Sequence, residues 1–448
     1  TKDASGGYKK LVQNIPGTII GESYTVSFWY KIGPDAGSVV KMWSNFRDSG
    51  GAFLDGTTDN ITLDVNGNVW TKYEETVTAP ATSVKFWFEL RTYNNTTVYF
   101  DDFSFVRNPF TWTGAANNNY NDAANWSTNA VPNENYDVII PSSATINMPA
   151  TLTVNSMSIA AGASIISDGT ITGLISYTRT IPTTNWYLIS SPLVGQDKDA
   201  FVTASNLATG TGNNVGFADY DNSTKAWSYY QSGASGTGNF LSGEGHAVKL
   251  NTAGDVVFTG AFNDADASFT LSYNTNGLNL IGNPYLASVS VKEMLEEVNI
   301  ETLLSEKTIW LWDQASESYG EKNLLNVLEI APGQAFFVSA AQTGNFSINE
   351  SMQLHSLDDT FQKTTTRPEV ALTLSNGAAS RTASIFYIDG ATTGFDNGYD
   401  SSIFGGLANE FSIFTHAVAN GSGKNLGTQS LPNNNFENMI VPVGVIAE

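Results

Sequence analysis

The sequence predicts an all-β protein of several domains, and three observations lead to that prediction. Its 448 residues exceed what a single core usually organises, since domains typically hold about 100–200 residues. Charged residues make up only 14% of the chain, aromatic residues reach 12% and there are 40 glycines, a mixture that favours strands and turns over helices. Several stretches also alternate between apolar and polar residues with a period of two, as half-buried strands do.

The clearest alternation lies within residues 1–107, where it predicts a β-sandwich of about 100 residues. Two strands are expected to bury every second side chain and to point the intervening ones away from the core. The intervening side chains include Trp29 in the first strand and Trp87, Glu89 and Arg91 in the second. The residues predicted to face the core are Tyr24, Val26, Phe28 and Tyr30, then Val84, Phe86, Phe88 and Leu90.

Trp29 and Trp87 occupy outward positions where a merely structural strand would carry threonine or lysine. An indole ring can stack on the C–H face of a pyranose, while Glu89 and Arg91 can hydrogen-bond to its hydroxyl groups. The sequence therefore predicts a solvent-facing aromatic platform that binds a glycan, and further candidates for it are Trp43 and Tyr93. The alternative is that the two tryptophans pack beneath loops, because tryptophan is buried on average.

Three motifs in this region carry a resemblance to a known family. Residues 21–28 read Gly-Glu-Ser-Tyr-Thr-Val-Ser-Phe, residues 70–73 read Trp-Thr-Lys-Tyr ahead of a Thr-Ala-Pro turn, and residues 99–104 read Tyr-Phe-Asp-Asp-Phe-Ser. This pattern resembles the jelly-roll carbohydrate-binding modules of the family 4/9/22 type. The resemblance implies a jelly-roll fold over residues 1–107 and binding of β-glucans, xylans or related chains across the concave sheet.

The same resemblance implies a structural Ca²⁺ near Asp101 and Asp102, because an aspartate at this place helps to bind calcium in the family. Calcium takes six to eight oxygen ligands, so backbone carbonyls of residues 3–7 or 34–38 are expected to join the carboxylates. The alternative is that both aspartates are solvated carboxylates at the end of a strand.

Residues 108–172 are predicted to form a small connecting module of short β-strands. They contain Trp-Thr-Gly, Asn-Trp-Ser, Val-Pro and Asp-Val-Ile-Ile-Pro in that order. This series resembles a unit common in large secreted surface proteins of Bacteroidetes.

An internal duplication organises residues 173–362. Three segments of the first half match three of the second at a nearly constant offset of about 90 residues, so we expect two pseudo-symmetric β units. The one predicted helix spans residues 290–304, with Ser290 as N-cap and Glu293 completing a capping box. The matching segments are 186–193 with 278–285, 220–227 with 312–319, and 243–248 with 333–338.

Residues 367–448 resume the alternation and are predicted to form a partial β-sandwich. Residues 393–400 and 440–445 resemble the domain that precedes the sorting domain in cargo proteins of the type IX secretion system. The resemblance implies export by the type IX secretion machinery to the cell surface or the exterior. The sorting domain itself is not found, and we expect the chain to come from a longer precursor.

Composition excludes several classes of function. The net charge of −22 disfavours nucleic acid and anionic membranes and favours a neutral or cationic partner. No cysteine is present, which excludes disulfides, thiol nucleophiles and iron–sulfur clusters, and the three histidines are too far apart in sequence to form a usual metallohydrolase site. No apolar run reaches the 18 or more residues of a membrane helix, so no membrane insertion is expected.

A catalytic site is not predicted. Glu244 invites a glycosidase interpretation, but it aligns with Gln334 in the other half, and a turn that accepts either residue indicates a backbone role. We therefore expect a non-catalytic extracellular protein that binds a polysaccharide or cell-surface glycan and acts in adhesion. Two alternatives stay open, namely the accessory region of a secreted polysaccharide-degrading enzyme and a purely structural stalk or filament subunit.

Overall fold

The structure is a computed structural model that describes residues 7–34, 37–54, 60–94, 96–274, 276–314, 316–326, 328–356, 368–406, 411–419, 423–434 and 436–447. The chain divides into two compact units, Thr1–Phe110 and Thr111–Glu448. Both consist mainly of β-strands joined by turns, which confirms the predicted fold class. Within the described ranges, no helix combines the length and the apolar character needed to cross a lipid bilayer.

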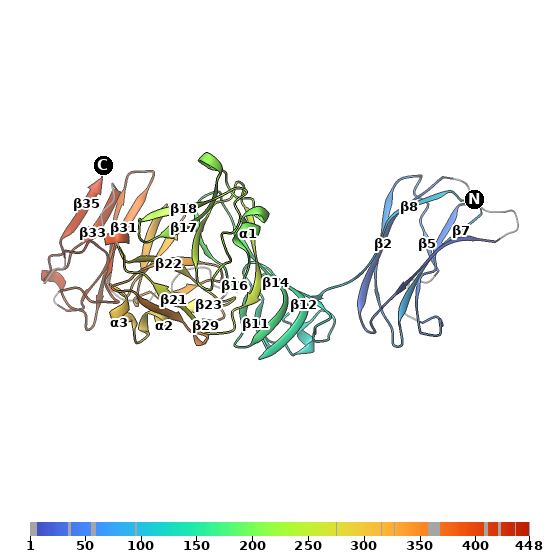
Figure 1. The fold of residues 1–448 in the computed structure, drawn as a ribbon, viewed down its shortest axis with the longest axis horizontal. Helices are drawn as coiled ribbons and strands as arrows, with labels where there is room; N and C mark the ends of the chain where they lie inside the picture. Colours follow the sequence, from blue (N-terminus) through green and yellow to red (C-terminus); the bar gives the residue numbers. More distant parts are fainter. Residues whose placement is uncertain are drawn as a thin grey trace. The chain divides into compact units, whose positions relative to one another are not determined.

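The first unit is a sandwich of two antiparallel sheets (Figure 1). One sheet has the order β1-β7-β3-β5, with β4 also paired to β7, and the other has the order β6-β2-β8. The strands are β1 (Lys9–Pro16), β2 (Ser23–Ile32), β3 (Val39–Met42), β4 (Asn45–Arg47), β5 (Ile61–Leu63), β6 (Thr71–Thr78), β7 (Lys85–Tyr93) and β8 (Val98–Arg107).

The core between these two sheets is aromatic. Phe86 stacks on Phe105 with ring centroids 4.4 Å apart, and Phe28 meets Phe88 edge-on at 5.7 Å. The predicted alternation in β2 and β7 is confirmed with one exception. Val84 is predicted to face the core, but it lies before the start of β7 and is 42% exposed. Its amide donates to the carbonyl of Arg47 at the end of β4.

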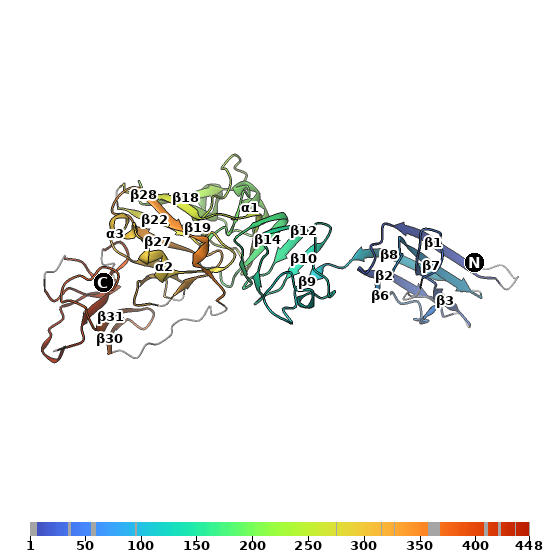
Figure 2. The same cartoon turned by 90° about the horizontal axis from the view of Figure 1, so that it is seen from below.

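The second unit begins with a coil of parallel strands (Figure 2). Short β-strands are predicted in this region, but β12 has 9 residues and β14 has 12. Asp137 pairs with Ser156 and Thr151 pairs with Thr170, which is the same separation along the chain. The boundary expected at residue 172 falls inside β14, which pairs with β12 on one side and β20 on the other. The strands are β9 (Phe110–Thr111), β10 (Asp137–Ile140), β12 (Thr151–Ile159), β14 (Thr170–Ile181), β16 (Leu193–Val194) and β20 (Gly254–Phe262), with β11 (Thr145–Asn147) and β13 (Ser164–Ile166) beside them.

Two four-stranded sheets confirm the internal duplication, because they share one topology. In each sheet the first strand pairs with the fourth, the fourth with the second, and the second with the third, counted along the chain. The resulting orders are β15-β19-β17-β18 and β22-β27-β24-β25. The strands of the first half are β15 (Tyr187–Ser190), β17 (Asn214–Asp221), β18 (Ala226–Gln231) and β19 (Gly245–Val248). Those of the second are β22 (Leu278–Gly282), β24 (Ile309–Asp313), β25 (Ser318–Lys322) and β27 (Ala335–Ser339).

The two halves exchange equivalent backbone contacts. The amide of Ser190 donates to the carbonyl of Gly333 at 3.2 Å, and the amide of Gly282 donates to the carbonyl of Gly243 at 3.0 Å. These are the same bond made twice, because each pair occupies matching positions of the repeat. Where the strands cross, a Cβ on Gly282 would lie 2.4 Å from the Cβ of Ser190, so the crossing has room for one side chain.

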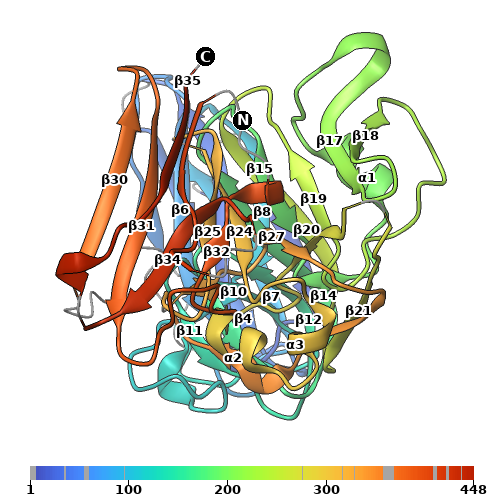
Figure 3. The same ribbon diagram turned by 90° about the vertical axis from the view of Figure 1, so that its left-hand side faces the viewer.

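The helix predicted over residues 290–304 is two shorter helices, α2 (Val291–Glu296) and α3 (Ile300–Leu303) (Figure 3). Ser290 is the N-cap as expected, since its hydroxyl accepts the amide of Glu293 at 3.3 Å. Glu297 has an extended ψ of 144°, which ends the first helix, and Val298 is 96% exposed instead of lying on an apolar helix face. The other helices are α1 (Lys198–Ala204) and the 3₁₀ turns Ala123–Asn125, Thr211–Asn213, Glu350–Met352, Phe404–Gly406 and Phe436–Asn438.

A six-stranded sheet ends the second unit, with the order β30-β31-β34-β33-β35 and β32 also paired to β34. It packs on the second half of the duplication, where the indole of Trp310 donates to the carbonyl of Ser402 at 3.0 Å. Its strands are β30 (Glu369–Ser375), β31 (Ser380–Ile388), β32 (Ser401–Ser402), β33 (Phe411–Thr415), β34 (Leu426–Pro432) and β35 (Val443–Ala447). The remaining short strands are β21 (Ala267–Leu271), β23 (Ser288–Ser290), β26 (Glu329–Ile330), β28 (Gly344–Ile348) and β29 (Gln353–Leu354).

The crossing of the strands at Ser190 and Gly282 accepts a side chain from only one of these two positions, which can be tested by mutation. Gly282→Ala should lower the free energy of unfolding of the second unit by about 1–3 kcal/mol, because the added methyl group overpacks the crossing. Combining Ser190→Gly with Gly282→Ser should recover part of that loss, since one side chain again fills the crossing. Urea denaturation measures both, with Ser190→Gly alone as control. A Gly282→Ala chain as stable as the wild type would contradict the packing argument.

Candidate functional site

Strand β7 positions the predicted site residues of the first unit. It lies between β1 on one side and β3 and β4 on the other, so its outward side chains have neighbours on both flanks. Trp87, Glu89 and Arg91 occupy alternate positions and lie together on the outer face, while Phe86 and Phe88 enter the core. The strand period therefore places an indole, a carboxylate and a guanidinium in one row.

Glu89 is the centre of this row, although only 3% of it is exposed. Its carboxylate accepts the indole N–H of Trp87 at 2.8 Å and the Nε–H of Arg91 at 2.5 Å, and Lys10 Nζ lies 3.9 Å away. Burial alone would raise the pKa of Glu89, but the hydrogen bonds from Trp87 and Arg91 and the charges of Arg91 and Lys10 lower it overall. The carboxylate thus stays ionised and fixes the orientation of both neighbours.

Cations stack on the aromatic rings of the same face. The guanidinium of Arg91 lies 4.4 Å from the ring centroid of Tyr8 and 4.2 Å from that of Trp43, and Arg47 lies 4.4 Å from that of Trp87. Such spacings are those of cation–π contacts. Tyr8 also meets Tyr93, with ring centroids 5.7 Å apart. We call this surface the β7 face and define it as Tyr8, Trp43, Arg47, Trp87, Glu89, Arg91 and Tyr93.

Trp29 does not belong to the β7 face, so the prediction of one platform carrying both tryptophans is wrong. Trp29 lies on β2 in the other sheet, opposite Lys72 of β6 and Asp101 of β8, and is 38% exposed. Because β2 and β7 bury their alternate residues in the same core from opposite sides, their outward residues point in opposite directions. Neither tryptophan is sealed in the core, and Trp29 adjoins a separate surface.

Asp101 and Asp102 lie in β8 at a break in its register with β2. Both are exposed, and the carboxylate of Asp101 accepts the amide of Asp102 at 2.9 Å. In the described part of the chain, no third aspartate, glutamate or histidine joins them in a cluster of possible metal ligands. Residues 3–6 and 35–36, whose carbonyls were expected to contribute, lie outside the described residues. The predicted calcium site therefore stays a prediction.

Three residues near the β7 face were not predicted from the sequence, namely Tyr8, Lys10 and Arg47. Tyr8 and Lys10 belong to the segment that leads into and forms β1, whose eight residues show no clear alternation of burial. The strand is recognised only through its pairing with β7, where Lys10 lies opposite Arg91. Arg47 is the last residue of β4 and lies opposite Lys85. With three residues, β4 is too short to give a periodic signal in the sequence.

The second unit holds a separate ionic cluster in the first half of the duplication. His246 is fully buried, with Nδ1 2.6 Å from Asp219 and Nε2 3.5 Å from Glu244. Lys198 Nζ lies 2.8 Å from Glu244, and the hydroxyl of Tyr230 donates to Asp219 at 2.9 Å. Two carboxylates therefore face two basic groups, and this balanced arrangement needs no metal ion to offset its charge.

The cluster also confirms the backbone role inferred for Glu244. Its Oε2 accepts the amide of Leu241 at 3.3 Å, and in the other half Oε1 of Gln334 accepts the amide of Ala331 at 3.2 Å. These bonds are equivalent, because both join a turn residue to the amide three positions earlier. Burial would raise the pKa of Glu244, but His246 and Lys198 bring it down to about 2.

Comparisons with known proteins give limited similarity. No protein-family model and no curated protein matches the chain. A solved structure described as "CBM4 structure and function" is 21% identical with a TM-score of 0.17, over 22% of this chain and 61% of that one. The CBM22-1 and GH10 modules of xylanase 10B from Clostridium thermocellum, in complex with xylohexaose, are 19% identical with a TM-score of 0.17, over 31% of this chain and 26% of that one. We therefore infer function from the geometry of the β7 face.

His246 predicts a pH dependence of stability in the second unit. Burial lowers its pKa, but Asp219 and Glu244 raise it overall above the ordinary value. The folded state then holds a proton that the unfolded state releases, so the stabilisation is complete below about pH 6.5 and is lost as pH rises through the folded pKa. The difference in melting temperature between wild type and His246→Gln should therefore shrink from about pH 5 to about pH 9.

His355 provides a control of opposite sign. Burial lowers its pKa, so its contribution should be lost as pH falls, and the difference between wild type and His355→Gln should grow with pH. Thermal melts of the three proteins across this range measure both slopes. Equal slopes for the two variants would contradict the assignment.

Proposed function

We propose that the first unit binds a glycan chain along its β7 face. The observation that carries this proposal is a set of aromatic rings and guanidinium groups on one face, in which Glu89 holds Trp87 and Arg91 on β7. Arg47 of β4 and Trp43 stack against these two residues from outside the strand. Aromatic rings supply surfaces for the C–H faces of sugar rings, and guanidinium groups supply several N–H donors for hydroxyl or carboxylate oxygens. The six residue steps from Trp87 to Tyr93 span roughly 20 Å at about 3.3 Å per residue, enough for several sugar rings.

Glu89 has a different role in this proposal from the one expected at first. A carboxylate that is 3% exposed is a poor ligand for sugar hydroxyls, and its oxygens already accept bonds from Trp87 and Arg91. Glu89 therefore acts as a positioning residue, and the groups that contact the glycan are Trp87, Arg91, Trp43 and Tyr93. Holding the binding groups in place before the glycan arrives reduces the entropy lost on binding.

We further propose that the chain is non-catalytic and acts outside the cell in adhesion to a polysaccharide or cell-surface glycan. The motif resemblances to carbohydrate-binding modules and to type IX secretion cargo support an extracellular location and export by that machinery. The chain could serve equally as the accessory region of a polysaccharide-degrading enzyme, in which case the bound glycan is also the substrate of a catalytic domain elsewhere in the protein. A purely structural stalk predicts no glycan binding.

Glycan binding should depend on Trp87 and not on Trp29. A glycan array followed by calorimetry should find a ligand for the full chain, and Trp87→Ala should weaken it about tenfold or more through loss of stacking. Trp29→Ala is the matched control, because it removes an exposed tryptophan from the opposite sheet and should leave affinity unchanged. Absence of any ligand, or equal losses in the two variants, would favour the stalk.

The calcium prediction has its own test. If Asp101 and Asp102 bind structural Ca²⁺, a chelator should lower the melting temperature of the first unit, and added calcium should restore it, because the ion binds only the folded state. Asp101→Asn together with Asp102→Asn should abolish that difference. A first transition that does not move with chelator would remove calcium from the description of this unit.

A further inference from the structure

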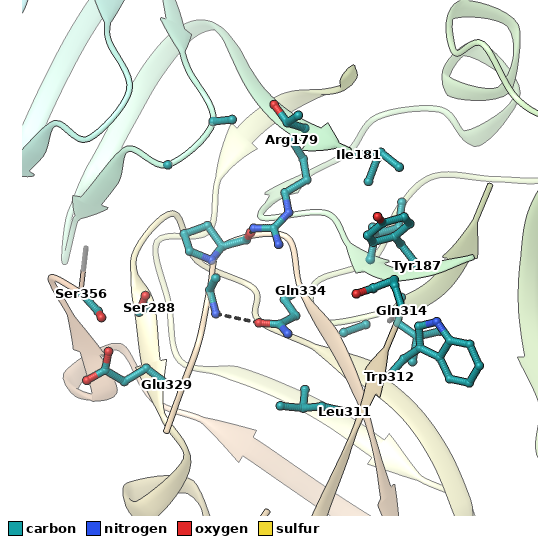
Figure 4. Close-up of a pocket in the computed structure, with 18 of the residues that line it drawn as sticks. Arg179, Ile181, Tyr187, Ser288, Leu311, Trp312, Gln314, Glu329, Gln334 and Ser356 are labelled. Carbon is teal, nitrogen blue, oxygen red and sulfur yellow. Dashed lines mark hydrogen bonds between the residues drawn. The ribbon is translucent and has the colours of Figure 1, made fainter. Parts of the chain in front are cut away.

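A cavity of about 880 Å³ lies in the second unit, apart from the residues that define the β7 face (Figure 4). It opens between the end of β14, strand β15 and the strands β24 and β25 of the second half, with the turn before β27 at its base. Its volume falls within the range of about 300–1,000 Å³ that is typical of small-molecule sites.

The turn at the base of the cavity has a counterpart in the first half that packs against an aromatic ring. A Cβ on Gly243 would lie 2.0 Å from the ring of Phe269, whereas at the equivalent Gly333 the nearest atom, in the ring of Tyr177, is 3.4 Å away. The place of Phe269 is taken in the second half by Arg179, since Arg179 and Phe269 pair with equivalent residues of β20 and β28. The two turns have equivalent backbones, but Phe269 packs against the turn at Gly243, whereas space remains beside the turn at Gly333. The cavity therefore results from the side chains and is not imposed by the fold.

The aromatic and basic groups at the cavity are held in fixed positions. The indole of Trp312 donates to the carbonyl of Trp186 at 2.8 Å, and the guanidinium of Arg179 donates to the carbonyl of Pro332 at 2.9 Å. Figure 4 shows Trp312 and Tyr187 on one side of the space with Gln314 between them. Two rings and an amide thus line one wall, and the indole of Trp312 is already held in place.

The charges that line the cavity balance one another. Arg179 and Lys322 contribute two positive charges, and Asp313 and Glu329 contribute two negative ones. Neither a phosphate nor a metal cation gains from such a lining, because attraction by one pair is offset by repulsion from the other. A neutral ligand with many hydroxyl groups can instead hydrogen-bond to both kinds of group while its C–H faces pack on the rings.

We propose that this cavity is a second binding site, specific for a short neutral saccharide and independent of the β7 face. The balanced polar lining selects an uncharged ligand, and the paired rings select one with flat C–H surfaces. The proposal does not depend on glycan binding by the first unit.

Gly320 offers a direct way to close the cavity. It lies in β25 opposite Leu311, both residues line the space, and no atom lies within 4 Å of a Cβ placed on it. Gly320→Tyr should therefore fill the cavity without disturbing the backbone. The matched control is Ser228→Tyr, which places the same ring on an exposed residue at the equivalent position of the first half.

The experiment uses the full chain carrying Trp87→Ala, which disables the β7 face. Neutral and carboxylate-bearing mono- to hexasaccharides are screened by calorimetry. The best neutral ligand is measured again with Gly320→Tyr, Ser228→Tyr and Gln314→Ala added one at a time. We expect Gly320→Tyr to weaken binding at least tenfold, Gln314→Ala to weaken it several-fold and Ser228→Tyr to leave it unchanged. Melting curves test whether each variant is folded. If Gly320→Tyr is unfolded, the effect of Gln314→Ala on affinity decides whether the ligand binds in the cavity.

Three outcomes would overturn the proposal. The first is that no neutral saccharide binds the Trp87→Ala chain. The second is that binding persists unchanged in Gly320→Tyr and Gln314→Ala, which would place the ligand elsewhere. The third is that only charged saccharides bind. These outcomes do not bear on the proposed β7 site, because that site is tested by binding that Trp87→Ala weakens.

Discussion

The two-residue period of the β-strand is the constraint on which the rest of this structure depends. The chain has no cysteine, so its sheets are joined by burial of apolar side chains and by backbone hydrogen bonds. In the first unit β2 and β7 bury alternate residues in one core. The intervening residues of each strand must then point away from that core. That requirement gathers Trp87, Glu89 and Arg91 into a row, and it also separates Trp29 from them.

A carboxylate that organises its neighbours occurs in both units, nearly buried at Glu89 and partly buried at Glu244. Glu89 holds an indole and a guanidinium, and Glu244 holds the ammonium group of Lys198 beside the ring of His246. Burial opposes ionisation of both carboxylates, yet nearby donors and cations lower both pKa values. The free energy spent on desolvating each charge yields orientation of the groups around it. In the first unit this orients the groups of the proposed glycan site, and in the second it orients groups packed between strands.

Local patterns in the sequence predict local structure here, and the failures arise from contacts between distant segments. Alternation predicts that Trp87, Glu89 and Arg91 share a face, because this follows from spacing along one strand. It does not reveal which sheet holds Trp29, since that depends on β2 pairing with β6 and β8. Tyr8 reaches the site through a strand whose burial does not alternate. Repetition of sequence predicts the shared topology of the two halves, but the cavity arises where their side chains differ, at Arg179 and Phe269.

The net charge of the chain is a poorer guide to its ligands than the charges on each surface. A total of −22 favours neutral or cationic partners, but at physiological ionic strength interactions between exposed charges are largely screened beyond about 8 Å. Within that distance the β7 face presents Arg47 and Arg91, with Lys10 and Lys41 paired on either side of Arg91, while its one carboxylate is buried among donors. The partly exposed charged groups among the residues that define the β7 face are therefore cationic. We expect a glycan that carries carboxylates to suit the proposed β7 site as well as a neutral one does, because both arginines can bind it. The balanced lining of the proposed cavity site disfavours such a ligand, so only the cavity is expected to discriminate against charged saccharides.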